Sequence, residues 1–572
     1  MQVHTFLMLI ALFLIGGCDS SKTPTQEDLP IADAIFSNGP IITMDDRQLT
    51  AEAVAIADGR ILAVGDLELV DVHRGDSTVM IDLEGRTLSP GFIDGHAHLA
   101  QFGAQAIGAN LLAAPDGEVE TIDQLVEKLT LFARSDDVQR TGWIFGTGYD
   151  DSILAEGRHP TRDDLDRVST DIPVIATHIS GHFAAVNSKA LELIGYDADT
   201  TDPVGGIIRR RSGSNEPNGV LEELAAIPVM MANIAPKTPE DELYFMRKGL
   251  ELAMSFGYTT AQEGRAFKSS HDALVGYATN VGFPIDVVSY IDYSNVSPLE
   301  SDWHTSGYRG GYRVGGLKIT LDGSPQGRTA WRTEPYLIPP DGQDADYAGY
   351  PAIPDDAIVA ELVDKAYANE WQVIIHANAD AAIDQMLRAI SAAYEKHGSG
   401  DRRSTLIHGQ YVRDDQLERM VELEMSVSLF PMHTFYWGDW HGQIIGEELA
   451  QGISPTRTAL DLGLPLTSHT DAPVALPNLM QVVWATVNRT SRTGKVIGPD
   501  ERLTPLEAMQ AVTLWGAQQH FEEDQKGSIE VGKLADLVIL SENPLAIEAD
   551  RLNEVLVLET IKNGETVWRR EQ

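Results

Sequence analysis

The sequence predicts an α/β protein centred on a (β/α)8 (TIM) barrel, with a small β-sandwich domain built from both chain ends and an insertion after the first barrel strand. Through the middle of the chain, short apolar strand-like runs alternate with helical segments, which is typical of a parallel sheet, and the number of repeats favours a closed barrel. Both chain ends instead carry short apolar runs separated by Asp-Gly and Glu-Gly turns, as hairpins do. An open doubly wound sheet is the alternative, but no glycine-rich phosphate loop follows the first strands.

The N-terminus is predicted to be an export signal. Its apolar run, Phe6 to Ile15, is too short to span a bilayer but suits the core of a signal peptide. "LIGGC" and a polar linker follow, and this resembles a bacterial lipoprotein signal, in which cleavage leaves Cys18 as the lipid-bearing N-terminus. We expect residues 1–17 to be the signal and 18–31 a linker, which would anchor the protein at the periplasmic side of the bacterial cell envelope. A plain secretory signal, giving a periplasmic or secreted protein, is the alternative.

The rest of the chain divides into three predicted regions. Residues 32–88 and 525–572 are expected to form the composite β-sandwich, and residues 89–524 the barrel. Residues 101–254 are long for one strand-to-helix connection and contain strand-like runs such as "GWIFGTGYDD", so they are interpreted as the insertion over the barrel mouth. Active sites of such barrels lie at that mouth, where an insertion can shape a substrate pocket.

The net charge and the cysteine content limit which kinds of partner and metal site the protein can have. The formal net charge of -42 argues against nucleic acid, which requires a basic face, and against adhesion to anionic lipid. We therefore expect membrane contact through the N-terminal lipid alone. Cys18 is the one cysteine, so an internal disulfide and a thiolate metal site are both excluded. The oligomeric state stays open.

Potential metal ligands recur where predicted strands end. In "GFIDGHAHL", His96 and His98 are two residues apart and are expected to share one face of a strand. Later strand-like runs carry further candidates near their C-terminal ends: Lys318, His376, His408, His469 and Asp471. A lone histidine at a strand end is more often structural. Several at successive strand ends would face one mouth, and imidazole with carboxylate suits Zn²⁺ or a similar divalent ion.

The combination resembles the amidohydrolase superfamily of metal-dependent hydrolases. "PGFIDGHAHL", the later ligands and the closing segment "GSIEVGKLADLVILSENP" carry this resemblance. Finer motifs are similar to those of the amidohydrolase-3 branch, which includes N-substituted formamide deformylase-like proteins: "GHFAAVNSKAL", "PNGVLEE", "LKITLDGSPQGRTA" and "TDAPV".

The resemblance implies roles for the ligands. His96 and His98 would hold one ion, and His376 and His408 a second. Lys318 would be carboxylated by CO₂ so that it could bridge them, because an unmodified ammonium repels cations. Asp471 would be both ligand and general base. From spacing alone, Lys318 would instead be a plain lysine whose stem packs along the barrel wall.

Four further residues are candidates through the same resemblance. His182, in the Gly-His pair of the insertion, would lie near the substrate and polarise the scissile carbonyl, with His178 as the alternative. Glu223 and Arg328 match family motifs and are expected to bind substrate; for each pair, a structural role is the competing interpretation.

The predicted function is metal-dependent hydrolysis of a non-peptide C–N bond, such as an amide, formamide or cyclic amide, in a small molecule. One or two divalent ions, with zinc expected, would activate water, and Asp471 would act as general base. Two alternatives remain: a non-catalytic binding or regulatory lipoprotein on the same fold, and a deaminase or isomerase using the same site. A non-catalytic relative would be expected to lose a ligand, and here every ligand type is present.

Overall fold

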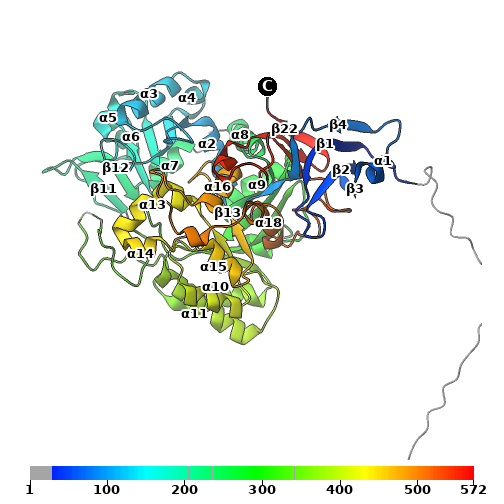
Figure 1. The fold of residues 1–572 in the computed structure, drawn as a ribbon. Coiled ribbons are helices and arrows are strands. Elements are labelled where there is room, and N and C mark those ends of the chain that lie inside the picture. The colour runs from blue at the N-terminus through cyan, green and yellow to red at the C-terminus, as the bar shows by residue number, and fades with distance from the viewer. Residues whose placement is uncertain (1–28, 204–205, 235–237, 341, 572) are drawn as a thin grey trace, which may run out of the picture.

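The computed structural model describes residues 29–203, 206–234, 238–340 and 342–571. Cys18 and the predicted signal and linker lie almost entirely outside these residues. Three sheets organise the chain (Figure 1). Within the described residues, no helix combines the length and the hydropathy that a bilayer crossing requires.

The central sheet has eight parallel strands in the order β19-β18-β17-β16-β15-β14-β13-β6. The strands are β6 (Phe92–Ile93), β13 (Tyr258–Ala266), β14 (Asp286–Asp292), β15 (Tyr312–Thr320), β16 (Gln372–Ala377), β17 (Thr405–His408), β18 (Ser426–Leu429) and β19 (Leu466–Ser468). Most are buried along their length, as expected when helices cover a parallel sheet. The predicted mixed α/β fold and its curled parallel sheet are confirmed.

A short segment lies between the two edge strands of this sheet. The N–H of Ile93, in β6, donates to the carbonyl of Val512, and the N–H of Ser468, in β19, donates to the carbonyl of Ala511, at 2.9 and 3.2 Å. The first and last strands are therefore held by the carbonyls of two consecutive residues, one strand each, and the loops that follow them meet.

Helices follow the central strands. They include α2 (Leu99–Ile107), α8 (Pro239–Ser255), α9 (Lys268–Asn280), α10 (Asp356–Ala368), α11 (Asp380–His397), α12 (Asp414–Glu422), α13 (Met432–Ile445), α15 (Thr456–Asp461), α16 (Leu479–Asn488), α17 (Pro505–Gln510) and α18 (Leu514–Gln519). Their apolar faces and the strands form the largest core cluster. Two of the helical segments of the sequence, "DDAIVAELVDKAYANE" and "AAIDQMLRAISAAYEKHG", correspond to α10 and α11.

Strands from both ends of the chain share a second sheet, seen as the blue and red strands side by side in Figure 1. Its order is β22-β21-β20-β5-β1-β2-β3, with β4 paired to β1. The strands are β1 (Ala34–Ile42), β2 (Thr50–Ala57), β3 (Arg60–Gly65), β4 (Val79–Asp82), β5 (Thr87–Pro90), β20 (Leu537–Leu540), β21 (Val557–Lys562) and β22 (Glu565–Arg569). The finer description as a β-sandwich, and the domain boundaries, stay predictions.

Buried charges join this terminal sheet to the central one. The carboxylate of Asp286, at the start of β14, pairs with Lys526 and, at 2.6 Å, with Lys562 of β21. Lys562 also lies 2.7 Å from Asp536. Because each buried charge has a partner, the cluster avoids the cost of an unpaired ion and fixes how the sheets pack.

The third sheet lies within residues 101–254, drawn in cyan in Figure 1. Its order is β11-β12-β10-β9-β8-β7, and its strands are β7 (Ala109–Asn110), β8 (Ile144–Tyr149), β9 (Val174–His178), β10 (Phe183–Val186), β11 (Gly206–Arg210) and β12 (Pro217–Glu223). Its helices are α3 (Ile122–Phe132), α4 (Asp136–Thr141), α5 (Arg162–Asp166), α6 (Ser188–Ile194) and α7 (Ile227–Ile234).

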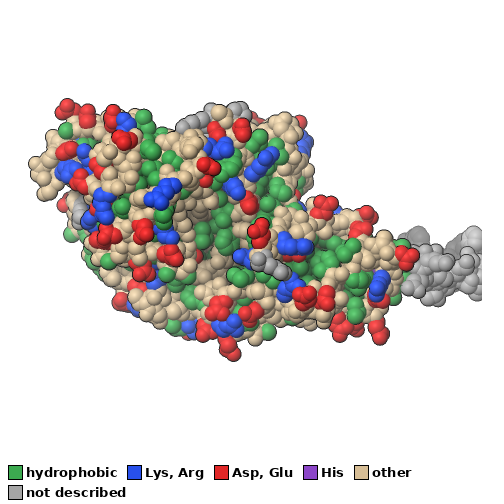
Figure 2. All heavy atoms as spheres, turned by 90° about the horizontal axis from the view of Figure 1, so that it is seen from above, with side chains coloured by type: hydrophobic (Ala, Val, Ile, Leu, Met, Phe, Trp, Pro, Cys, Tyr) green, Lys and Arg blue, Asp and Glu red, His purple; other side chains and the backbone are tan. Residues whose placement is uncertain are grey.

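Acidic side chains are spread over the face shown in Figure 2, with basic side chains among them. On this face the acidic side chains do not gather in one patch. A dispersed charge of one sign favours solubility.

Candidate metal centre and active site

The first and last central strands bring His96 and His98 next to Asp471. The N–H of Asp471 donates to the carbonyl of His96 at 3.0 Å, and the N–H of His98 donates to the carbonyl of Ala472 at 2.9 Å. Strand β6 ends at Ile93, so the two histidines lie beyond the strand, in the turn before α2. The expectation that they share a strand face is therefore wrong; backbone pairing with the Asp471 loop is what places them together.

Asp94 holds together the loop after β6 and the loop after β19. Its buried carboxylate accepts hydrogen bonds from the N–H of His96 at 3.1 Å, the hydroxyl of Tyr258 at 2.6 Å, and the hydroxyl and N–H of Thr470 at 2.5 and 3.3 Å. Burial raises the pKa of Asp94 to about 6, although these hydrogen bonds favour its ionised form. One side chain thus ties the loop of the first strand to the loop of the last.

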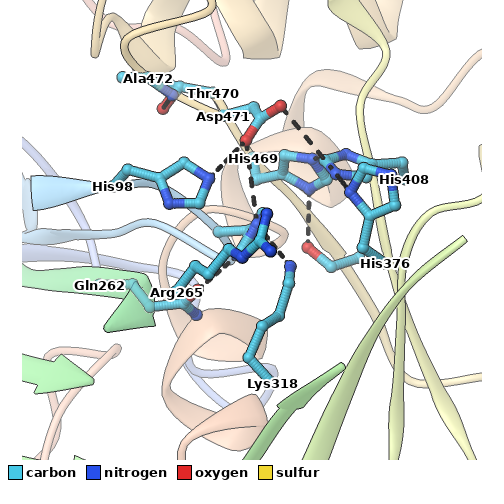
Figure 3. A network of polar contacts seen from close by, with 12 residues as sticks. His98, Gln262, Arg265, Lys318, His376, His408, His469, Thr470, Asp471 and Ala472 are labelled. Atoms are coloured by element: carbon cyan, nitrogen blue, oxygen red, sulfur yellow. Dashed lines mark hydrogen bonds and ion pairs between the residues drawn. The ribbon is translucent and has the colours of Figure 1, made fainter. Parts of the chain in front are cut away.

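Three side chains meet closely enough to hold a metal ion: His96, His408 and Asp471. The Oδ1 atom of Asp471 lies 3.8 Å from Nε2 of His96 and 3.3 Å from Nε2 of His98, while its Oδ2 atom lies 4.0 Å from Nε2 of His408 (Figure 3). Oδ1 is buried and accepts no hydrogen bond from the described residues. A buried carboxylate oxygen that faces imidazole nitrogens and accepts no hydrogen bond is suited to be a ligand of a cation.

His376 and Lys318 border the same group. His376, in β16, places Nδ1 3.1 Å from Nε2 of His408, the last residue of β17. Lys318, in β15, places Nζ 3.0 Å from Nε2 of His96 and is almost fully buried. The structure therefore brings together all six predicted ligands, from five different strands or the loops after them.

The protonation states of His96 and His408 suit metal binding. Burial, together with nearby basic groups, holds the pKa of His96 and His408 well below its usual value, so both imidazoles are neutral and keep a free lone pair. Burial also lowers the pKa of Lys318 to about 7. For Asp471, burial would raise the pKa, but the His98 ring and other nearby basic groups hold it below its usual range.

The insertion covers this group and completes a cavity of about 260 Å³. Its wall contains His98, Lys318, His376, His408 and Asp471 from the central sheet and His178 and His182 from the insertion. An apolar portion of the wall is formed by Ala104, Phe145, Ile179, Met230, Pro473 and Val474. A cavity with a polar end and an apolar end is typical of a small-molecule site.

His182 is held from two sides. Glu223 places Oε2 2.8 Å from Nδ1 of the ring, and the N–H of His182 donates to Oγ of Ser180 at 3.2 Å. Burial opposes protonation of His182, but the charge of Glu223 and its hydrogen bond outweigh burial, so the pKa is raised. With Nδ1 engaged, Nε2 is the ring atom left for the cavity.

His178 and Arg328 have other surroundings. Oγ and the N–H of Ser180 lie 2.8 and 3.1 Å from Nδ1 of His178, and its Nε2 lies 3.0 Å from Asp151, so its ring braces the loop that carries His182. Arg328 donates to the carbonyls of Ile338 and Pro339 at 3.2 and 3.3 Å. Together with Glu223 it lines a second cavity, of about 640 Å³, which shares His178 with the first. Neither Glu223 nor Arg328 lines the cavity that contains Asp471.

Sequence reasoning gave no role to Gln262, Arg265 and Asp322, which shape the site, and it named His469 only as one of the candidate ligands near strand ends. Gln262 lies 2.6 Å from Nδ1 of His96, and Arg265 lines the cavity; both belong to "AQEGR" at the end of β13. His469 places Nε2 3.1 Å from Nδ1 of His408, and Asp322 accepts the N–H groups of Asn378 and Ala379. The available signal was the same for all four: polar side chains at or just beyond the end of a central strand.

Comparison with known proteins gives consistent results. The family described as "Amidohydrolase family" matches residues 79–568. Putative amidohydrolase YtcJ of Bacillus subtilis is 27% identical over 94% of this chain and 99% of its own. N-substituted formamide deformylase of Arthrobacter pascens is 27% identical over 94% of this chain and 98% of its own. A solved structure of a metal-dependent hydrolase from Pyrococcus horikoshii has a TM-score of 0.70 and 25% identity, covering 90% of this chain and 99% of that one.

Proposed function

The chain belongs to the amidohydrolase family and is a hydrolase acting on C–N bonds, and from this we propose that it cleaves a small non-peptide amide, formamide or cyclic amide with a divalent metal ion and Asp471 as general base. The observation that supports this most strongly is the buried Oδ1 of Asp471, which accepts no hydrogen bond from the described residues and faces the neutral imidazole of His96 and the ring of His98.

We propose that His96, His98, His376, His408, Asp471 and a carboxylated Lys318 hold one or two ions, with zinc the ion that this mixture of nitrogen and oxygen ligands suits. Carboxylation needs a neutral amine, and the buried Lys318, with a pKa of about 7, supplies one. When bound, the metal supplies Lewis acidity that makes water a nucleophile at neutral pH.

The chain's own residues move the protons. Asp471 accepts a proton as water attacks the carbonyl carbon and returns it to the departing nitrogen, which is otherwise a poor leaving group. His182, oriented by Glu223, directs Nε2 toward the carbonyl oxygen and donates to it as negative charge develops. The insertion around His182 forms part of the cavity wall above the candidate ligands.

Replacement of the base gives the direct test. The Asp471→Asn variant is expected to fold and to lose turnover by at least about 100-fold, because an amide cannot accept the proton. Asp302→Asn, at a side chain that is 93% exposed, is the matched control and should keep full activity. Amide hydrolysis by Asp471→Asn at the wild-type rate would place the base elsewhere.

We also propose export and lipid anchoring at Cys18, on the sequence pattern alone. Blocking lipoprotein signal processing in cells should leave a larger precursor; an unchanged size would favour a plain secretory signal.

A further inference from the structure

Arg265 lies on the wall of the cavity that contains Asp471, and the proposed mechanism assigns no role to it. It is near the end of β13, and its Nε donates a 2.8 Å hydrogen bond to Oδ2 of Asp292, at the end of β14. Among the described residues, its two terminal nitrogens donate no hydrogen bond, and 37% of the side chain is exposed. The guanidinium is thus fixed on one edge and open on the other. Figure 3 shows it among the same ligands as Lys318.

The carboxylates around Arg265 are already engaged. Glu263 accepts the N–H of Ala100 at 2.8 Å and the N–H of Arg265 itself at 3.2 Å. Asp322 accepts three backbone N–H groups, and Asp292 also accepts the N–H of Ser294. Among the described residues, Asp292 is the one carboxylate within ion-pair distance of Arg265, so the open edge of the guanidinium has no second carboxylate bound to it.

An open guanidinium edge beside a small cavity has a definite chemical preference. Its parallel N–H groups match the two oxygens of a carboxylate, and such bidentate pairs are among the stronger hydrogen bonds in proteins. The same cavity offers an apolar portion formed by Ile179, Met230 and Val474. A ligand that satisfies both would carry an acid group and an apolar group around a central amide.

We propose that Arg265 binds a carboxylate of the substrate, so that the substrate class is an N-acylated or N-formylated amino acid with an apolar side chain. This rests on the proposed amide hydrolysis and extends it: the metal centre and Asp471 cleave the bond, and Arg265 selects amides whose acid group lies a few bonds from it. Arg265 is here a specificity residue that contacts substrate.

A matched ligand pair tests the selection. N-formyl-leucine and N-formyl-leucinamide differ in the acid group, and their binding to the metal-loaded protein is measured by calorimetry and by kcat and KM. We expect the acid to bind about 10- to 100-fold more tightly than the amide, since a charge-assisted bidentate pair replaces a neutral contact. Arg265→Gln should abolish this preference, Arg265→Lys should restore part of it, and metal content should stay unchanged.

The control is Arg388→Gln, which removes the same charge from an exposed arginine of α11. It should keep the preference. Equal binding of acid and amide by the wild type, or binding of neither, would overturn the proposal. An equal loss for both ligands in Arg265→Gln would show that Arg265 polarises the carbonyl instead, and loss of metal would show that it pairs with a carboxylated Lys318.

Failure of the proposed function would give a different result: the metal-loaded wild type would then hydrolyse no compound of a broad amide panel, whatever it binds.

Discussion

At the scale of single residues, the candidate ligands have unusual backbone geometry. Asp471 and His408 adopt φ values of 51° and 76°, in the left-handed region that side chains usually avoid. Such conformations cost about 1–3 kcal/mol each and persist where the surrounding structure holds them. Here the hydrogen bonds between the loops of the first and last strands hold Asp471 in place.

Lys318 gives a first residue-scale prediction. Lys318→Ala removes the side chain that would become carboxylated, so metal content should fall, and a short carboxylic acid such as propionate should restore part of it by occupying the vacated space. Elemental analysis and activity with and without propionate make the measurement. Lys365→Ala, at a half-exposed surface position, is the control. Wild-type metal content in Lys318→Ala would contradict a ligand role.

Gly264 gives a second prediction at the scale of single residues. A Cβ at this position would lie 2.1 Å from Cε1 of His96, so Gly264→Ala must displace the imidazole. We expect metal affinity to fall by about 10-fold or more while the protein stays folded, as when a ligand's support is removed. Gly276→Ala, whose Cβ would meet no atom within 4 Å, is the control. Unchanged metal affinity in Gly264→Ala would argue that His96 is not a ligand.

The candidate ligands that could be identified from the sequence are those marked by a pattern in the residues next to them. His376, His408 and Asp471 could be predicted because each follows or ends an apolar run that has the length of a strand. Arg265 and Gln262 share that placement but carry no ligand chemistry that marks them. The contact of Glu223 with His182 depends on the antiparallel pairing of β10 with β12, a long-range register that the sequence does not encode locally.

At the scale of elements, the order of the central strands was predictable and the details of their ends were not. Runs such as "PIDVVSYID" and "STLIHGQ" are strands because they are short, apolar and bounded by turns. In contrast, β6 has two residues, and the turn that carries His96 and His98 is organised by Asp94 and by the Asp471 loop. Tertiary hydrogen bonds, rather than strand alternation, aim these imidazoles.

The buried side chain of His441, in helix α13, makes the stability of the fold depend on pH. Its ring lies 2.7 Å from the hydroxyl of Tyr411 and 3.1 Å from His433, and burial lowers the pKa of His441 to about 3. The unfolded chain binds a proton near the ordinary value of 6.5. Acidification below that value therefore favours unfolding, by up to about 1.4 kcal/mol per pH unit from this one group.

The test compares unfolding midpoints from pH 7.5 to pH 5. The wild type should lose stability across this range, and His441→Gln, which keeps a polar side chain without a titrating ring, should show a smaller slope. His73→Gln, at a partly exposed ring, is the control and should keep the wild-type slope. An unchanged slope in His441→Gln would show that the ring already titrates normally in the folded protein.

At the scale of the whole molecule, two parts of the chain supply the site and a third part packs against the central strands. The central sheet provides the candidate ligands, the insertion provides His182 and most of the apolar wall, and the two chain ends form a sheet tied to the central strands through Asp286. The cavity is therefore complete only when segments more than 200 residues apart are folded together. This agrees with the family match, which extends over residues 79–568.

The central claim, metal-dependent hydrolysis at this site, is tested most directly by removing and restoring the metal. Purified protein is analysed for divalent ions, dialysed against a chelator, and assayed on N-formylated amino acids and a wider amide panel before and after metal is returned. We expect one or two ions per chain, loss of turnover when the metal is removed, and recovery of turnover on addition of zinc or a similar ion. Full turnover by metal-free protein would contradict it.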